Sequence, residues 1–185
     1  MAVTPSTMLP LGTIAPDFTL PDTESDALIS LRDGKATPQA TVIMFICNHC
    51  PFVKHIQQKL VSIAKEYQKK GIRFIAISAN DVKNYPADSP ENMRSEAKQA
   101  GYTFPYLYDE TQAVAKTYQA ACTPDFYVFD QHLACVYRGR FDQSRPGNAT
   151  PVTGDDLTQA LDQLLTKQPV NSKQFPSIGC NIKWK

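Results

Sequence analysis

The stretch Thr41-Val42-Ile43-Met44-Phe45-Ile46-Cys47-Asn48-His49-Cys50-Pro51 joins an apolar run to two cysteines that are separated by two residues. The run at 41–46 predicts a strand, and its nearly continuous apolar character indicates that both faces of that strand are covered. Apolar residues at helical spacing follow Pro51 and predict a helix that ends before Gly71. A Cys-x-x-Cys motif where a strand meets a helix is typical of a redox-active pair.

The chain after this helix continues the pattern of an α/β fold. A second apolar run lies at 72–78, and strand, helix and strand in this order predict a βαβ unit with parallel strands and a right-handed crossover. Ser89 and Pro90 are residue types preferred at the cap and at the first position of a helix. A second helix is therefore predicted from Pro90 to Ala100, with Gly101 ending it.

The remaining segments predict an antiparallel half of the sheet and a closing helix. Further short strands are expected at 104–108, 126–129 and 133–137, the last two as a hairpin. A capping-box-like pattern at 109–112 predicts the start of a third helix, and Thr153 is expected to cap the last one. Segments 15–22 and 27–31 predict an N-terminal β-hairpin. The expected fold is α/β, with a mixed central sheet and helices on both faces.

Composition and charge narrow the functional classes. The chain has 185 residues, of which 42% are hydrophobic and 20% charged, so one globular domain of ordinary size is expected. The net charge of +1 gives no electrostatic basis for binding nucleic acid. No apolar stretch approaches the roughly 20 residues of a membrane span. Residues 1–14 carry no secretory pattern and the five cysteines are an odd number, which favours a cytoplasmic protein with reduced thiols.

Three motifs together resemble the thioredoxin superfamily. Ala15-Pro16-Asp17-Phe18-Thr19-Leu20 comes first, then Cys47-x-x-Cys50-Pro51, and then Cys122-Thr123-Pro124 at the start of the predicted hairpin. More narrowly, the sequence is similar to the redoxin branch, which includes alkyl hydroperoxide reductases and thiol-specific antioxidant proteins. The resemblance implies a thioredoxin-like domain at 1–168 and a tail at 169–185 that packs on this domain.

The resemblance also implies the geometry of the site. Pro124 is expected to be a cis proline that lies against the cysteine pair, a rare conformation even before proline. The backbone of its neighbour is expected to pair with a bound substrate. Residues expected to support the pair are His49, Pro51, Cys122, Thr123 and Pro124.

The chemistry expected of the pair is thiol-disulfide exchange. Cys47 is expected just before the helix and Cys50 in its first turn, so that free N–H groups and the helix dipole stabilise a Cys47 thiolate. His49 between them adds positive charge when it is protonated. The sequence therefore predicts a thiol-disulfide oxidoreductase with Cys47 as the nucleophile and Cys50 as the resolving cysteine.

A thiol peroxidase is the main alternative. Peroxidases of the resembled branch carry Pro-x-x-x-Thr-x-x-Cys, and alignment on the strand end places Cys50 at their peroxide-reacting cysteine. Ile43 then replaces the proline and Cys47 replaces the threonine. The arginine that those enzymes use falls at Pro124. Because the groups that orient a peroxide are missing, disulfide exchange is favoured over peroxidase activity.

Metal binding is the third alternative. Copper-delivery proteins on the same fold use a Cys-x-x-x-Cys pair and a distant histidine, whereas here the spacing is two residues and His132 lies in a hairpin turn. A structural zinc site needs four ligands, and no second Cys-x-x-Cys is present. The prediction is an enzyme without metal or cofactor. Its expected partners are a protein or small-molecule disulfide, or a peroxide, and a thiol electron donor such as thioredoxin or glutathione.

Two further cysteines stay open at this point. Cys122 lies two residues before Pro124 and is expected near the pair, either as a third redox thiol or as a small buried apolar residue. Cys180 and Trp184 lie in the tail, which shows no periodicity. Either the tail folds back and brings one of them to the pair, or it packs away from the site.

Overall fold

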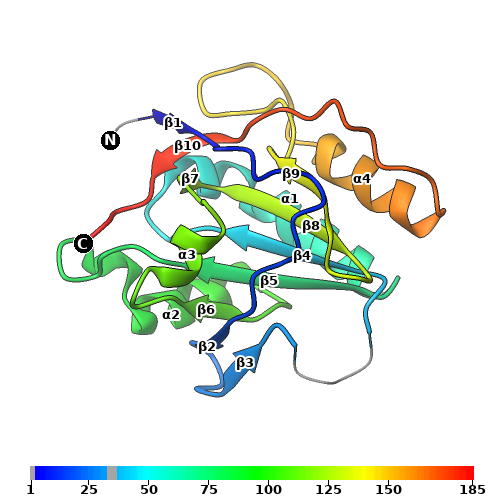
Figure 1. The fold of residues 1–185 in the computed structure, drawn as a ribbon. Helices are drawn as coiled ribbons and strands as arrows, with labels where there is room; N and C mark the ends of the chain where they lie inside the picture. The colour runs from blue at the N-terminus through cyan, green and yellow to red at the C-terminus, as the bar shows by residue number, and fades with distance from the viewer. Residues whose placement is uncertain (1–2, 33–36) are drawn as a thin grey trace.

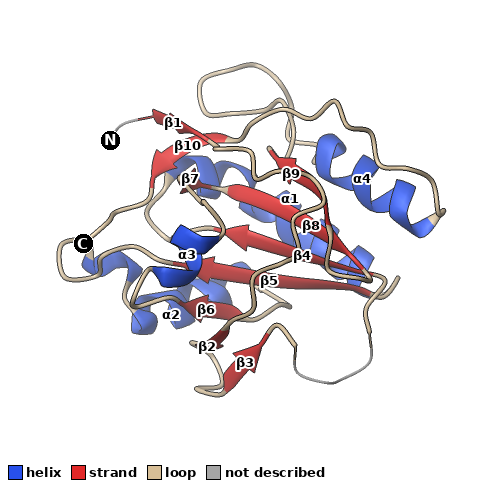
Figure 2. Cartoon of the chain, viewed as in Figure 1, coloured by secondary structure: helices blue, strands red, loops and turns tan. Residues whose placement is uncertain are grey.

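A five-stranded mixed sheet crosses the middle of the molecule (Figures 1 and 2). The computed structural model describes residues 3–32 and 37–185. In the order of the sheet, the strands are β6 (Tyr106–Tyr108), β5 (Ile72–Ser78), β4 (Ala40–Phe45), β8 (Asp125–Asp130) and β9 (Cys135–Gly139). β4, β5 and β6 are parallel, and β8 and β9 add an antiparallel half. The predicted α/β class and mixed sheet are confirmed.

The side chains of β4 divide the interior into two apolar cores. Val42 and Met44 pack into one core, and Ile43 and Phe45 pack into the other, as the two-residue repeat of a strand requires. The helices in the first core are α1 (Pro51–Gln68), α2 (Pro90–Ala100) and α4 (Asp155–Leu165). The short helix α3 (Ala113–Thr117) and the N-terminal segment cover the second core. Helices therefore lie on both faces of the sheet.

The N-terminal hairpin is present but shorter than predicted. β2 (Thr19–Pro21) pairs antiparallel with β3 (Leu28–Ser30), and Asp22 continues toward β6 through a bridge to Leu107. The hairpin therefore lies beside β6, the edge strand of the central sheet, and adds to the packing of the second core. None of the helices within 3–32 and 37–185 combines the length and the apolar character needed to cross a membrane.

The start of α2 follows the sequence signal, whereas the start of α4 does not. The Ser89 hydroxyl accepts the N–H of Asn92, as expected for a capping serine. Gly154, not Thr153, occupies the cap of α4, in a left-handed conformation, although the Thr153 hydroxyl accepts the N–H of Asp155 at 3.3 Å. The Asp142 carboxylate accepts the N–H groups of Thr153 and Gly154 and so holds the two residues before the helix.

The third helix was also predicted too early. The 109–112 segment forms a turn, and α3 begins only after Gln112, which has a φ of 63°. Asp109 accepts the N–H of Ala115 from this turn at 2.8 Å. The acidic residue therefore stabilises the helix start through a contact that a capping box does not describe.

The tail forms a strand that the sequence analysis did not identify. β10 (Ile178–Asn181) lies between β1 (Val3–Pro5) and β7 (Cys122–Thr123), antiparallel to both (Figure 1). The N–H of Ile182 then donates to the carbonyl of Ala121 at 3.0 Å. Three segments that are distant in sequence thus form a second sheet, which holds the tail against the segment that contains Pro124.

Gly179 is predicted to be required for this second sheet. A Cβ at this position would lie 2.0 Å from the carbonyl oxygen of Thr123, which is backbone and cannot yield without moving β7. We expect Gly179→Ala to separate β10 from β7 and to lower the free energy of unfolding by about 2 kcal/mol or more. Thermal and urea unfolding measure this loss. Ile178→Ala, on the same strand but with a partly exposed side chain, is the matched control, and an equal loss in both variants would contradict the prediction.

Candidate active site

The two cysteines of the motif lie between β4 and α1 with reduced thiols. Cys47 is 2% exposed and Cys50 is fully buried. α1 begins at Pro51, so Cys50 occupies the cap rather than the first turn. Pro51 suits the first helical position because its fixed φ matches the helix and its missing N–H would have no partner there. Cys50, and not Cys47, is consequently the residue next to the free N–H groups of the helix start.

Thr123 and Pro124 lie opposite the pair, as the resemblance implied. The Thr123–Pro124 peptide bond is cis. The Cys50 sulfur lies 3.1 Å from the Thr123 carbonyl oxygen, and the Cys47 sulfur lies 3.4 Å from the Thr123 hydroxyl. One threonine therefore contacts both sulfur atoms.

The surroundings of the two sulfur atoms favour ionisation of Cys50. A hydrogen bond from the Cys47 thiol lowers the pKa of Cys50 to about 5, against the effect of burial, with further hydrogen bonds from Cys180, Thr123 and the Val53 N–H. The same bond to Cys50 raises the pKa of Cys47, as do burial and the Asp88 carboxylate. The direction of both pKa shifts favours an anion at Cys50 rather than at Cys47.

This distribution differs from the expected thiolate at Cys47. Cys50 is the residue at the cap of α1, so it lies nearer than Cys47 to the free N–H groups of the first helical turn. Cys47 lies three residues earlier, where the nearest charged group is a carboxylate. The two positions therefore experience opposite electrostatic environments although they belong to one motif.

His49 lies beside Cys47 and is oriented by Asp88. Its Nδ1 is 2.6 Å from an Asp88 carboxylate oxygen, and its ring stacks on Tyr85 with centroids 5.6 Å apart. One potential ligand or proton-accepting atom from each of Cys47, His49 and Asp88 lies within 4.8 Å of the others. A thiol, an imidazole and a carboxylate in this arrangement can transfer a proton from sulfur to the ring.

Asp88 also holds the backbone of the motif in place. Its carboxylate accepts the Asn48 N–H at 2.8 Å and the Asn80 side-chain amide at 2.8 Å, in addition to the His49 ring. Cys47, His49 and Asp88 are of residue types that bind metals, but both carboxylate oxygens are already engaged by these donors. Sequence patterns do not single out Asp88, because an aspartate in the turn η1 (Pro86–Asp88) has no local feature that separates it from a surface acid.

The tail brings Cys180 to the site, which decides the question that the sequence left open. Cys180 is 3% exposed and pairs with Thr123 in the second sheet. Its thiol is hydrogen bonded to the Cys50 sulfur. Trp184, in contrast, is 42% exposed and lies against the Lys116 ammonium group. The Thr123 backbone, which was expected to be open to a substrate, is paired with β10 instead.

The other two cysteines differ in their distance from the pair. Burial and the Asp125 carboxylate raise the pKa of the Cys122 thiol, whose sulfur lies 3.9 Å from the Pro124 carbonyl oxygen. Its residue pairs with Asn181, one position away from the pair formed by Thr123 and Cys180. Cys135 lies in the second core, where burial raises its pKa to about 11. Cys135 therefore belongs to the packing of the sheet.

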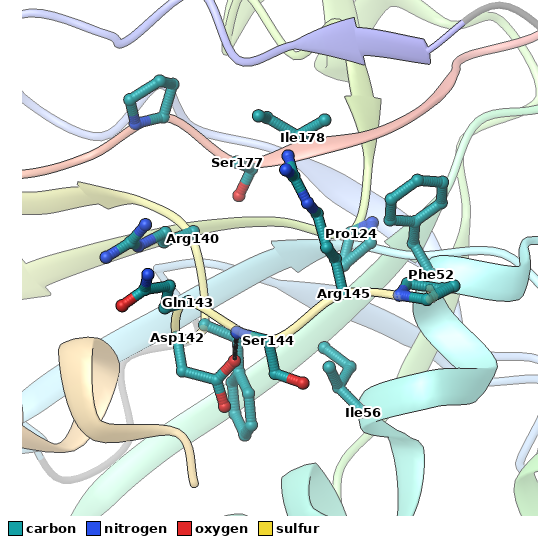
Figure 3. A pocket seen from close by; sticks show the side chains of 13 residues that line it. Phe52, Ile56, Pro124, Arg140, Asp142, Gln143, Ser144, Arg145, Ser177 and Ile178 are labelled. Atoms are coloured by element: carbon teal, nitrogen blue, oxygen red, sulfur yellow. Dashed lines mark hydrogen bonds between the residues drawn. The ribbon is translucent and has the colours of Figure 1, made fainter. Parts of the chain in front are cut away.

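A pocket opens between the start of α1, Pro124 and the tail (Figure 3). Phe52 from α1, Pro124 and Ile178 from β10 give it apolar walls. Arg140 and Arg145 from the loop after β9 add cationic groups. The pocket combines apolar and cationic surface next to the residues that flank Cys50 and Cys180.

A buried carboxyl group follows directly after the cis peptide bond. Asp125 has no exposed surface, and burial raises its pKa to about 7. It accepts hydrogen bonds from the Tyr127 hydroxyl at 2.8 Å and the Ser6 hydroxyl at 2.9 Å. Ser6 follows β1, so this carboxyl group links the N-terminal strand to the segment that carries Thr123.

Comparison with known proteins places these features in a family. An uncharacterized conserved protein from Geobacillus kaustophilus has 58% identity and a TM-score of 0.97, covering 100% of this chain and 97% of that chain. The hypothetical protein SMc02350 from Sinorhizobium meliloti 1021 has 46% identity and a TM-score of 0.95, covering 98% of each chain. The thiol-disulfide oxidoreductase ResA of Geobacillus thermodenitrificans is 25% identical over 167 residues, covering 87% of this chain and 82% of that protein.

More distant likenesses concern the fold alone. Solved thioredoxin domains and related proteins with 18 to 22% identity superpose with TM-scores from 0.63 to 0.65. They confirm a thioredoxin-like fold. Residues 11–138, more than half of the chain, match the AhpC/TSA family. The chain therefore belongs to the AhpC/TSA family.

Proposed function

We propose that the protein is a thiol-disulfide oxidoreductase in which Cys50 attacks a substrate disulfide and Cys47 resolves the mixed disulfide. The observation that carries the proposal is the low pKa of Cys50 at the start of α1, with the Cys47 thiol hydrogen bonded to it. A thiolate is the reactive form in disulfide exchange. This assignment exchanges the two roles expected from the sequence, and the similarity to ResA supports the reaction class.

The reaction has two exchange steps. In the first, the Cys50 thiolate attacks one sulfur of the substrate disulfide, a Cys50–substrate disulfide forms, and the other substrate sulfur leaves as a thiolate. In the second, the Cys47 sulfur attacks Cys50, the Cys47–Cys50 disulfide forms, and the second substrate thiolate leaves. The substrate gains the two electrons that the pair loses, and a thiol donor such as thioredoxin or glutathione returns them.

His49 acts in the second step as the proton acceptor. The pKa of Cys47 is raised, so its thiol must lose a proton before it can attack. The His49 ring lies in the same cluster and its orientation is fixed by the bond of Nδ1 to Asp88. The thiolates that leave take up protons from solvent.

The substrate enters where Pro124 and Phe52 line the pocket. Its apolar walls suit the side chains or methylene groups around a disulfide, and Arg145 suits a carboxylate group, whereas Arg140 is already paired with Asp156. Both a protein disulfide and a small disulfide such as oxidised glutathione fit this chemistry. The near-complete burial of both sulfurs favours the smaller substrate.

Parallel rate measurements test the proposal. With dithiothreitol as the donor, the protein is assayed for reduction of insulin, of oxidised glutathione and of hydrogen peroxide. We expect at least one disulfide to be reduced at least about tenfold faster than by dithiothreitol alone, and faster than peroxide. Peroxide turnover that exceeds turnover of both disulfides would refute the proposal.

Peroxide reduction is the second candidate, favoured by the match of Cys50 to the peroxide-reacting position of the family. In that reaction the Cys50 thiolate attacks one peroxide oxygen, a sulfenic acid forms, and the other oxygen leaves as water or an alcohol after taking a proton. The Cys47 thiol then forms the disulfide and releases water. The replacement of the family's threonine by Cys47 and of its arginine by Pro124 removes groups that polarise a peroxide.

A further inference from the structure

The thiols of Cys47, Cys50 and Cys180 lie close together in the fold, with Cys50 as the one that both others contact. The Cys50 sulfur lies 3.1 Å from the carbonyl oxygen of Thr123, the residue that pairs with Cys180 across β7 and β10, and the Cys47 and Cys180 thiols both act on the pKa of Cys50 through hydrogen bonds. All three belong to one apolar core and are at most 3% exposed. The Cys-x-x-Cys motif accounts for Cys47 and Cys50 only, so Cys180 adds a nucleophile that the two-step reaction does not use.

The position of Cys180 is fixed by backbone contacts on both sides of β10. Cys180 pairs with Val3 of β1 and with Thr123 of β7. Two residues later, the N–H of Ile182 donates to the carbonyl of Ala121. Gly179 allows β10 to approach Thr123 closely. The thiol is therefore presented to Cys50 by a sheet rather than by a mobile segment.

We propose that Cys180 is a third redox thiol, which forms a disulfide with Cys50 in alternation with Cys47. This proposal rests on the proposed function only for its place in turnover. Cys180 attacks the Cys50 sulfur of a Cys47–Cys50 disulfide, the Cys50–Cys180 bond forms, and Cys47 leaves and takes the proton that Cys180 gives up. The number of disulfides is unchanged. Cys180 also resolves a Cys50–substrate disulfide in the same way as Cys47 does.

The protonation of the three sulfurs agrees with this exchange. Burial and the bond to Cys50 raise the pKa of Cys180 to about 12, so Cys180 is a thiol while Cys50 is a thiolate. The pKa of Cys47 is raised as well, and a thiolate of raised pKa leaves slowly, so the proton that Cys180 gives up must reach Cys47 as the S–S bond breaks. Cys47 and Cys180 are thus two thiols that can each form a disulfide with the Cys50 sulfur.

Disulfide mapping in Cys47→Ser tests the new bond directly. The variant is treated with one equivalent of diamide, remaining thiols are alkylated, and the peptides are analysed by mass spectrometry. We expect a Cys50–Cys180 disulfide as the main product. Cys47→Ser/Cys135→Ser is the matched control, because it removes a second buried thiol from the other core and should give the same product. Free, alkylated Cys50 and Cys180 in the treated variant would overturn the proposal.

Turnover of a disulfide substrate tests the role of this bond. We expect Cys47→Ser to retain roughly a tenth of wild-type reduction of oxidised glutathione, and Cys47→Ser/Cys180→Ser to lose at least about tenfold more. Equal rates in these two variants would overturn the resolving role. Cys47→Ser/Cys180→Ala repeats the comparison, and melting temperatures confirm that each variant is folded.

The two measurements separate the failure of this proposal from that of the proposed function. Mapping with diamide requires no substrate turnover. A Cys50–Cys180 disulfide without any disulfide reductase activity would support the third thiol and reject the proposed function. Disulfide reductase activity in the wild type, with no Cys50–Cys180 disulfide in Cys47→Ser, would support the proposed function and reject the third redox thiol.

Discussion

Replacement of Cys50 by serine is expected to lower disulfide reduction by at least about a thousand-fold, the largest effect on activity that we predict. Cys50 is the sulfur that the helix start, Thr123 and two neighbouring thiols stabilise as an anion, and a serine hydroxyl at this position stays protonated. Initial rates of reduction of oxidised glutathione measure the loss. Wild-type activity should fall as the pH drops through about 5, where Cys50 takes up its proton.

Two further variants make this result specific. Cys135→Ser removes a buried thiol of the second core and should keep the wild-type rate, which controls for general effects of cysteine replacement. Cys47→Ser should lose far less than Cys50→Ser, because a second resolving thiol remains. A greater loss in Cys47→Ser than in Cys50→Ser would show that Cys47 is the attacking residue, as the sequence alone had suggested.

Asparagine at position 125 is expected to stabilise the protein above pH 7. The pKa of Asp125 is raised to about 7 in the fold, against about 3.9 for an aspartate in an unfolded chain. Between these pH values the folded state binds a proton that the unfolded state has lost, so the free energy of unfolding decreases as the pH rises. Asp125→Asn removes this dependence and should gain on the order of 2–4 kcal/mol at pH 8.

Urea unfolding from pH 4 to pH 8 measures this effect. The wild-type free energy should fall across the window while that of Asp125→Asn stays more nearly level. Glu24→Gln, which removes an exposed carboxylate, is the control and should follow the wild-type curve. A variant that is less stable than wild type at pH 8 would mean that the amide cannot share the hydrogen bonds of Ser6 and Tyr127.

The parts of the fold that the sequence predicted are those with local signals. The βαβ unit from 41 to 78 carries two apolar runs and a helix with one apolar face, so its elements are visible without knowledge of their partners. α2 has its own cap at Ser89 and its own stop at Gly101. A short turn joins β8 and β9, so the sequence pattern that predicts this hairpin also lies within one segment.

The parts that the sequence missed depend on distant contacts. β1 and β10 are three and four residues long, too short for an alternating pattern to be recognised. They become strands because each finds backbone partners in another part of the chain. The cap of α4 falls one residue later than predicted, at Gly154, and the distant Asp142 carboxylate holds Thr153 and Gly154 ahead of the helix.

The residues of the site also separate into those with a local sequence signal and those that depend on distant contacts. Cys47, Cys50 and Pro124 were identified because a motif and a family resemblance contain them. Cys180 and Asp88 were not assigned, because only the fold brings them to the pair, where Cys180 lowers the pKa of Cys50 and Asp88 raises that of Cys47. The chemistry of the motif was therefore predictable, whereas the division of roles within it was not.

The second sheet has a consequence for the order of folding. β4, α1 and β5 are neighbours in sequence and can associate early, whereas β1, β7 and β10 must close long loops before they pair. We expect the Cys50 environment to mature last, so a folding intermediate would carry the cysteine pair without Cys180 beside it. In such an intermediate the thiols of Cys47 and Cys50 can form non-native disulfides. Packing of β10 against β7 then prevents these side reactions.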